Sequence, residues 1–459
     1  MADFAGATCA PVTLAVVVLP IPHSLRINID TVPKTSIHRG FTLNSLQGKT
    51  AHHNPHPEPP SPQPSAGSTM RAMTGLAERL PHVAAFPEAL GTGLLLHTDV
   101  ALDDGLSNCI DMFISTYEAA LSRFKDDSTV GRMRTATHGG TFDFPDWALG
   151  LFGLYDQLFA STNGTIDPCV GEDLIRLGYD ESYSFTPAPD AAEHAGAIHG
   201  RAVWSADVER HGTTLITHSP VALDFGACGK GYLVDLLAGM LGDGAGHPQP
   251  IQYVIDAGGD LLVHTDEPIT IALEDPADPA NAVGTVEISH GAFCASSPSR
   301  RHWSDAAGHQ LHHLLNAIDG LPVDDVAATW VAVTPPSSAI TTKTSTHGSN
   351  ASTTANRDTD DSSNTVAAHV PVTLADGLAT ALFTTPATQL RAHFPFECAI
   401  LNANRTAAQS PNFPGGFFYT LMYEIISITS SGAFPRVDRW VAPPQSATLT
   451  APLGEGSRV

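Results

Sequence analysis

The amino-acid sequence predicts an α+β fold, in which a single body of mixed sheets and flanking helices carries a disordered N-terminal region and a long low-complexity loop insertion. Three observations lead to this prediction. Helical and strand-like patterns alternate irregularly, unlike the regular order of a βαβ array. Two stretches rich in small polar residues interrupt the apolar pattern. Apolar residues make up 42% of the 459 residues, which is enough to bury a large core.

The folded body is expected to span residues 81–415. Before it, residues 1–80 contain a stretch rich in Pro, His and Ser that cannot bury enough apolar surface to offset its ordering entropy. Residues 335–367 form a second low-complexity run, and we expect a disordered surface-loop insertion there, because long flexible loops cost little extra closure entropy. Residues 416–459 are expected to be a C-terminal tail, of which 417–428 is apolar enough to form a strand.

Two helices and one strand are predicted outside the motifs described below. Apolar residues recur at helical spacing over 110–124, which predicts an amphipathic helix. A second helix is predicted over 147–158, and Asn163-Gly164 provides a suitable C-terminal stop. The apolar residues of 253–255 indicate a strand before a glycine-containing turn.

The charge balance argues against nucleic acid or an anionic membrane as the main partner. The chain has a net charge of −24, whereas phosphate-rich partners are bound by clustered Lys and Arg. Lysine is scarce, and only Lys125 and Lys230 lie in segments predicted to fold. Each of these two side chains is therefore a candidate for a specific role.

Cysteine spacing and hydropathy bear on the compartment. The six cysteines form neither a CxxC motif nor a Cys/His ligand spacing, so we expect free thiols in a reducing compartment. No stretch reaches the roughly 20 apolar residues needed to span a bilayer. Residues 10–21 are apolar but lack the flanking features of a secretory signal. We therefore expect a cytoplasmic protein without a transmembrane segment.

A glycine-rich loop at 221–241 is the strongest local motif. A short apolar strand leads into Gly226, Gly229 and Gly231, Lys230 lies between the last two, and a helix is predicted to follow. Glycines allow close approach of a ligand, and free N–H groups at a helix start attract phosphate. The spacing fits neither a P-loop nor the GxGxxG motif. Taken alone, the segment is equally compatible with a tight turn that carries a solvated Lys.

Three further motifs contain candidate polar ligands. The DAGGD turn at 256–260 could pack closely on a ligand, although a simple hairpin turn has the same pattern. Asp376 and Thr380 lie four residues apart on a predicted helix, so their oxygens could converge on Mg²⁺; an Asp interacting with its own helix dipole is the alternative. In HHLLNAIDG at 312–320, a neutral His could act as a general base, although a surface His is the common case.

The order and character of these motifs resemble those of the FAD:protein FMN transferases, the ApbE family. The resemblance covers residues 85–410 apart from the insertion at 335–367. The matching segments are Leu90-Gly91-Thr92, LSRFKDDS (121–128), TNGTIDPCVG (162–171), LGYD (177–180), LDFGACGKG (223–231), DAGGD (256–260), SSPSRRHW (296–303), HHLLNAIDG (312–320) and ADGLAT (375–380).

The resemblance implies a Mg²⁺-dependent transfer of FMN from FAD to a Ser or Thr hydroxyl of an acceptor protein, with release of AMP. It assigns the metal to Asp376, Thr380 and the backbone carbonyl of Ala227. Lys230 is expected at the pyrophosphate, and His313 as the base or the positioning group for the incoming hydroxyl. The other FAD-binding residues that it implies are Gly91, Thr92, Ser122, Arg123, Asp167, Gly229, Gly258, Gly259, Asp260 and Ser296.

The sequence departs from the family pattern at three places. Asn316-Ala317 stands where the family has Asp-Pro, Asp319 stands for a Thr, and Leu90 stands for a Met. These changes could alter acceptor recognition or slow turnover, but they leave the glycine loop and the metal pair intact. Two other functions stay open: an FAD pyrophosphatase that yields FMN and AMP, and a non-catalytic FAD-binding protein.

Overall fold

The structure is a computed structural model that describes residues 75–242, 251–305, 308–334, 370–418 and 425–427. The insertion predicted at 335–367 and most of the N-terminal region predicted to be disordered lie outside the described residues. The predicted boundary at 81 is too late. Leu76 and Leu80 are buried at the short helix α1 (Leu76–Arg79), so the body begins before it.

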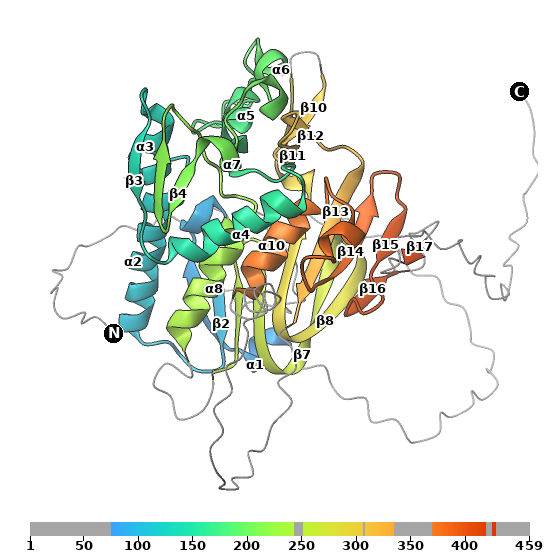
Figure 1. Ribbon diagram of the computed structural model, residues 1–459. Coiled ribbons are helices and arrows are strands. Elements are labelled where there is room, and N and C mark those ends of the chain that lie inside the picture. Colours follow the sequence, from blue (N-terminus) through green and yellow to red (C-terminus); the bar gives the residue numbers. More distant parts are fainter. Residues whose placement is uncertain (1–74, 243–250, 306–307, 335–369, 419–424, 428–459) are drawn as a thin grey trace, which may run out of the picture.

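A ten-stranded sheet forms the centre of the molecule (Figure 1). Its strands run in the order β1-β2-β6-β7-β8-β13-β14-β15-β17, and β16 pairs with β8. Neighbours are antiparallel except β15 and β17, which confirms the α+β prediction. The strands are β1 (His82–Phe86), β2 (Leu94–Thr98), β6 (Tyr253–Asp256), β7 (Leu261–Asp275), β8 (Asp278–Ser296), β13 (Val326–Val333), β14 (Glu397–Asn402), β15 (Ala407–Gln409), β16 (Gly415–Phe417) and β17 (Ile425–Ser427).

The sheet corrects the prediction for the C-terminal end. Phe417 of β16 is buried and β16 pairs with β8, so the chain beyond residue 415 still belongs to the body. The single strand predicted over 417–428 is also wrong. Its described residues belong to two strands, β16 and β17, that pair with different neighbours.

Three small sheets accompany the large one. One has three strands and lies beside the helices at the left of Figure 1, and the other two are hairpins near its top. They consist of β3 (Gly140–Asp143), β5 (Thr214–Thr217) and β4 (Glu209–His211); of β9 (His302–Ser304) and β10 (Gln310–His312); and of β11 (Leu315–Asn316) and β12 (Leu321–Pro322).

The longer helices cover one face of the large sheet, and α4, α8 and α10 lie together there (Figure 1). The helices are α2 (Asp104–Leu121), α3 (Thr129–Thr135), α4 (Ala148–Ser161), α5 (Gly171–Arg176), α6 (Ala191–His194), α7 (Trp204–Asp207), α8 (Gly229–Leu241), α10 (Pro371–Ala381) and α11 (Ala387–Leu390), with 3₁₀ turns η1 (Ala89–Gly91), η2 (Pro168–Val170), η3 (Ala197–His199) and η4 (Pro298–Arg300).

The helix and turn predictions within the body are confirmed. The Asp103 side chain caps α2 by accepting a hydrogen bond from the N–H of Leu106, which fixes the start of the helix. Asn163 and Gly164 both have positive φ just after α4, as a helix stop requires. The turn after β6 contains two glycines with positive φ, Gly258 and Gly259.

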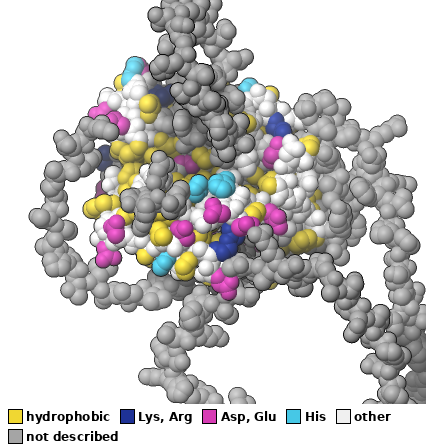
Figure 2. All heavy atoms as spheres, turned by 90° about the horizontal axis from the view of Figure 1, so that it is seen from below, with side chains coloured by type: hydrophobic (Ala, Val, Ile, Leu, Met, Phe, Trp, Pro, Cys, Tyr) yellow, Lys and Arg dark blue, Asp and Glu magenta, His cyan; other side chains and the backbone are white. Residues whose placement is uncertain are grey.

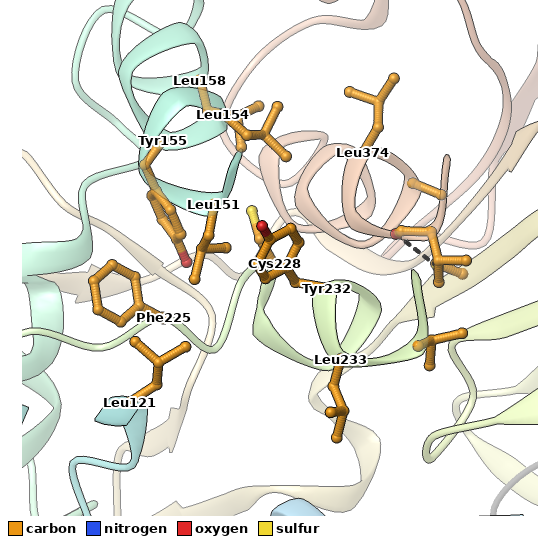
Figure 3. Packing of buried hydrophobic residues seen from close by; sticks show 14 of the residues in the cluster. Leu121, Leu151, Leu154, Tyr155, Leu158, Phe225, Cys228, Tyr232, Leu233 and Leu374 are labelled. Atoms are coloured by element: carbon orange, nitrogen blue, oxygen red, sulfur yellow. Dashed lines mark hydrogen bonds between the residues drawn. The ribbon is translucent and has the colours of Figure 1, made fainter. Parts of the chain in front are cut away.

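Both faces of the large sheet are buried. Alternate residues of β13 show this, because Val331 packs with the helices whereas Trp330 packs into a second cluster on the opposite face. Figure 3 shows how the helix-side core meets the glycine loop. Its labelled side chains include those from α4 (Tyr155), from the loop before α8 (Phe225 and Cys228) and from α10 (Leu374), and all belong to one buried cluster. The start of α8 is thus held by a dry core on one side, which leaves its other side for a ligand.

Candidate active site

A cavity of about 710 Å³ opens where α2, α8 and α10 meet the ends of β8 and the 313–317 segment. Most of the residues singled out from the sequence line it. Asp260, Asp376 and Gly259 do not line the cavity, and the two carboxylates lie behind Lys230. The predicted residues in its wall are Gly91, Thr92, Ser122, Arg123, Asp167, Ala227, Gly229, Lys230, Gly258, Ser296, His313 and Thr380.

Lys230 lies between two buried carboxylates. Its Nζ is 3.1 Å from Oδ2 of Asp260 and 3.2 Å from Oδ1 of Asp376, and each of these two side chains is at most 2% exposed. Burial alone would lower the pKa of Lys230, but the two carboxylates raise it well above its usual range. Burial and Asp260 raise the pKa of Asp376, and Lys230 opposes this change. With both carboxylates ionised, the cluster has one excess negative charge, which favours a further cation.

The start of α8 differs from the expected phosphate cradle. The N–H groups of Cys228 and Gly229 both donate to the carbonyl of Phe225, and the N–H of Gly231 donates to Asp376 at 3.0 Å. The expectation of free N–H groups is therefore wrong for these three residues. The loop contributes its Lys instead, and a Cβ at Gly231 would lie 2.4 Å from the carbonyl oxygen of Val372. Glycine is required there because the first turn of α8 packs directly on α10.

Asp376 and Thr380 occupy successive turns of α10, as predicted. Oγ1 of Thr380 lies 3.5 Å from Oγ of Ser296 at the end of β8. Ala227 belongs to the same cavity wall. Carboxylate, hydroxyl and carbonyl oxygens are a donor set that suits a hard cation. Within the described ranges, no group of three or more His, Cys, Asp or Glu side chains is placed to hold a metal, so any such site depends on hydroxyl and backbone oxygens.

His313 has a defined tautomer. Its Nδ1 lies 3.3 Å from the carbonyl oxygen of Arg301, and because a carbonyl only accepts, Nδ1 carries the proton. Burial and the Arg301 guanidinium lower the pKa of His313 to about 3. The imidazole is therefore neutral at physiological pH, and Nε2 has a free lone pair. A neutral His with an available nitrogen can accept a proton from a hydroxyl.

Arg123 is committed to the structure of the cavity wall. Its guanidinium pairs with the Asp224 carboxylate, donates to the Tyr179 carbonyl oxygen at 2.7 Å, and stacks on the rings of Phe124 and Tyr179. Burial alone would raise the pKa of Asp224, but Arg123 holds it below its usual value. Ser122, next to Arg123, ends α2, and its carbonyl accepts from the hydroxyl of Ser128. These contacts shape the pocket.

Asp167 is likewise occupied by internal contacts. Its carboxylate accepts from the N–H of Cys169 at 2.8 Å and lies 3.5 Å from the Arg201 guanidinium. Arg201 also pairs with Asp173 at 2.8 Å and donates to the carbonyl of Ala317. This network fastens the segment after His313 to the body. Ala317 strengthens it, because its N–H donates to the Thr165 carbonyl at 3.1 Å, a bond that a Pro could not make.

The DAGGD turn contacts the opposite end of the cavity wall. The N–H of Gly259 donates to Asp256 at 2.9 Å, which closes the turn. A Cβ at Gly258 would lie 3.0 Å from Oγ1 of Thr92, so the turn packs tightly against the 91–92 segment. Gly91 has a φ of +65°. Gly91 and Gly258 thus permit close backbone approach in the cavity wall.

Sequence reasoning missed an aromatic group that contributes to the cavity wall. Phe124 and Tyr183 line the cavity and stack with centroids 5.2 Å apart. Phe185 packs on Trp303 with centroids 5.4 Å apart, outside the cavity lining. Tyr183 and Phe185 both have positive φ and are 46% and 41% exposed. Bulky residues seldom adopt this backbone conformation. The conformation is not predictable from local sequence, because neither residue is of the type that favours it.

The surface agrees with the charge argument. On the face seen in Figure 2, acidic side chains are scattered among apolar ones and basic side chains occur singly.

No helix in the described ranges is long and apolar enough to cross a membrane. The cysteines that the structure describes are all free thiols, as expected.

The chain is similar in sequence to proteins named FAD:protein FMN transferase. The FAD:protein FMN transferase of Klebsiella pneumoniae is 21% identical over 249 residues, which is 52% of this chain and 70% of that protein. The FAD:protein FMN transferase of Salmonella typhimurium is 24% identical over 225 residues, 47% of this chain and 63% of that protein. The matched region therefore spans less than two thirds of the Salmonella relative.

Solved structures show the same fold. The ApbE protein of Thermotoga maritima superposes with a TM-score of 0.55 at 17% identity, covering 72% of this chain and 97% of that one. The flavin transferase ApbE of Vibrio cholerae superposes with a TM-score of 0.51 at 18% identity, covering 70% and 93%. The sequence model of the ApbE family matches residues 90–347, more than half of the 459 residues, and the chain therefore belongs to the ApbE family.

Proposed function

We propose that this chain transfers FMN from FAD to a Ser or Thr hydroxyl of an acceptor protein and releases AMP, with Mg²⁺ as the required ion. The observation that carries the proposal is the convergence of Lys230 with its two carboxylates and the neutral His313 around one cavity. The relatives named FAD:protein FMN transferase support it. The cavity volume of about 710 Å³ falls in the range of small-molecule sites.

The donor set fits the implied ion. Asp376 is a buried member of the cluster with Lys230 and Asp260, Thr380 presents a hydroxyl, and Ala227 belongs to the same cavity wall as Thr380. These are the residues that would hold Mg²⁺. When bound, the ion would neutralise charge on phosphate oxygens.

The chain's own residues supply the rest of the chemistry. The acceptor oxygen bonds to the FMN phosphorus while the bond from that phosphorus to the bridging oxygen breaks, and AMP leaves with the bonding electron pair. Nε2 of His313 receives the hydroxyl proton, because Nδ1 already donates to the Arg301 carbonyl. Lys230 provides a fixed positive charge for the pyrophosphate, and its two carboxylates hold it in place.

The test is to incubate the purified chain with FAD, Mg²⁺ and a set of candidate acceptor domains, and then to denature the mixture. Flavin fluorescence that stays with the acceptor after denaturation, and that is lost when EDTA replaces Mg²⁺, is the expected result. FMN and AMP formed without any acceptor would support an FAD pyrophosphatase instead. Tight FAD binding without AMP release would support a non-catalytic binding protein.

A further inference from the structure

Among the residues that the structure describes, Arg301 is an arginine whose guanidinium has no partner. It is half-buried at the end of the η4 turn, where its N–H donates to the Pro298 carbonyl at 3.1 Å. Within the described residues, no hydrogen bond, ion pair or ring contact reaches its guanidinium. The other described arginines all have partners: Arg79, Arg123, Arg132, Arg134, Arg176, Arg201, Arg210, Arg300, Arg391 and Arg405.

The Arg301 guanidinium shares its cavity wall with acidic as well as basic residues. Five of the acidic residues already pair with other basic side chains: Glu118, Asp167, Glu181, Asp224 and Glu274. Arg301 lines the cavity together with Lys230 and His313. Its charge lowers the pKa of His313, after burial the main cause of that change, and it opposes the raised pKa of Lys230. Asp260 and Asp376 compensate Lys230, whereas within the described residues no carboxylate pairs with the Arg301 guanidinium. A half-buried guanidinium without a counter-ion favours an anion as its ligand.

We propose that the Arg301 guanidinium binds non-bridging oxygens of the FAD pyrophosphate on the side of His313. The inference rests on the proposed function and adds a substrate-contacting residue to it. A planar guanidinium suits this task because it can donate two parallel hydrogen bonds to a phosphate group. A phosphate at this position would bring the phosphorus close to His313. The backbone carbonyl of Arg301 holds the Nδ1 of His313.

The contact between Arg301 and the pyrophosphate would also change how readily His313 accepts a proton. Without a ligand, the positive charge of Arg301 opposes protonation of His313. A pyrophosphate bound to Arg301 offsets that charge, so His313 becomes a better proton acceptor when the substrate is present. The base is thereby strengthened only in the complex in which the reaction takes place.

The experiment compares Arg301→Gln with Arg300→Gln in direct binding assays with FAD and with riboflavin, which lacks phosphate. Arg300 is the matched control, because it is adjacent and lines the same cavity but its exposed guanidinium is already paired with Glu274. We expect Arg301→Gln to weaken FAD binding by roughly tenfold to hundredfold and to leave riboflavin binding unchanged. Arg300→Gln should change neither affinity.

Two outcomes overturn the inference: unchanged FAD affinity in Arg301→Gln, or an equal loss of FAD and riboflavin affinity. Arg301→Lys provides a second variant, which keeps the charge but loses the fork and should bind FAD with intermediate affinity. Because these assays use neither acceptor nor turnover, they separate the two claims. An FAD affinity that depends on Arg301, without any flavin transfer, would support this inference and contradict the proposed function.

Discussion

Arg201 and Arg301 both contact the 313–320 segment, Arg201 through its guanidinium and Arg301 through its backbone carbonyl, and their guanidinium groups differ in every contact. Arg201 is 1% exposed in its side chain, pairs with Asp173 and Asp167, and donates to the Ala317 carbonyl. Arg301 is half-buried in a cavity wall, and none of the described residues pairs with its guanidinium. A buried cation with all its partners holds a fold together. A guanidinium left without a counter-ion in a cavity wall indicates a site for an anion.

The largest effect on activity is expected from Asp376→Asn. This change removes a carboxylate beside the cavity that Arg301 lines. We expect Mg²⁺-dependent transfer to fall on the order of 10³-fold, because charge on the phosphate oxygens would lose its counter-ion. Asp235→Asn is the matched control, since Asp235 is half-buried against α10 and accepts from the N–H groups of Val372 and Thr373 at its start. Transfer by Asp376→Asn at the normal rate would remove the metal assignment.

The next effect concerns the base. His313→Gln should lower the transfer rate by roughly 10²- to 10⁴-fold while FAD affinity stays close to normal. His312→Gln serves as the control, because Nδ1 of His312 accepts the Leu314 N–H at 3.2 Å and this residue does not line the cavity. Stopped reactions that measure AMP release give the rates. Equal losses in both variants would contradict the assignment of His313 as the base.

Changes at Arg201, the arginine whose guanidinium is fully paired, should lower the stability of the protein. Arg201→Met leaves Asp173 and Asp167 buried without a counter-ion, so the free energy of unfolding should fall by about 3–5 kcal/mol. Arg176→Met removes a surface pair with Glu172 and should cost under about 1 kcal/mol. Urea denaturation measures both values. If Arg201→Met unfolds at the same urea concentration as the unchanged chain, the network does not hold the 313–320 segment.

The pH dependence that His313 contributes should be weak. Since burial and Arg301 lower the pKa of His313 to about 3, the neutral base form persists as pH falls and is lost only near that value. The profile of kcat/KM, which reports the free enzyme, should therefore lack a His313-dependent inflection near the ordinary histidine pKa of about 6.5. An inflection from Asp376 is separate, because burial and Asp260 raise the pKa of that carboxyl to about 7. An inflection near the ordinary histidine pKa that disappears in His313→Gln would show that Arg301 does not act on His313 as inferred.

The smallest effect is expected at a departure from the family pattern. Oδ1 of Asn316 accepts from the N–H of Ile318 at 3.0 Å, and an Asp oxygen can accept the same bond. Asn316→Asp should therefore change the free energy of unfolding by less than about 0.5 kcal/mol, as measured by urea denaturation. A large loss would show that the amide group of Asn316 has a further structural role.

Local pattern predicted much of the fold. The apolar spacing over 110–124 predicted α2, and Asn163-Gly164 predicted the end of α4, because these signals depend on neighbouring residues alone. The α+β class followed from the irregular order of such signals. The strand pairings at the C-terminal end were missed, since β16 joins β8 through contacts far apart in the sequence.

The candidate site was only partly predictable for the same reason. Resemblance to a family, rather than spacing, brought Lys230 and Asp376 together across 146 positions. Nothing in SSPSRRHW distinguishes Arg301 from Arg300. The difference arises because Glu274, 26 residues away, reaches Arg300 and leaves its neighbour unpaired. The occupied N–H groups at the start of α8 likewise depend on Phe225 and α10, so the glycine pattern could not reveal them.

The most direct test of the proposed function is the stoichiometry of one reaction that contains the purified chain, FAD, Mg²⁺ and an acceptor domain. AMP released and flavin bound covalently to the acceptor are measured in the same sample. Transfer predicts that the two amounts rise together in a one-to-one ratio, because each attack by an acceptor hydroxyl expels one AMP. AMP that rises with free FMN, while the acceptor stays unlabelled, would contradict it.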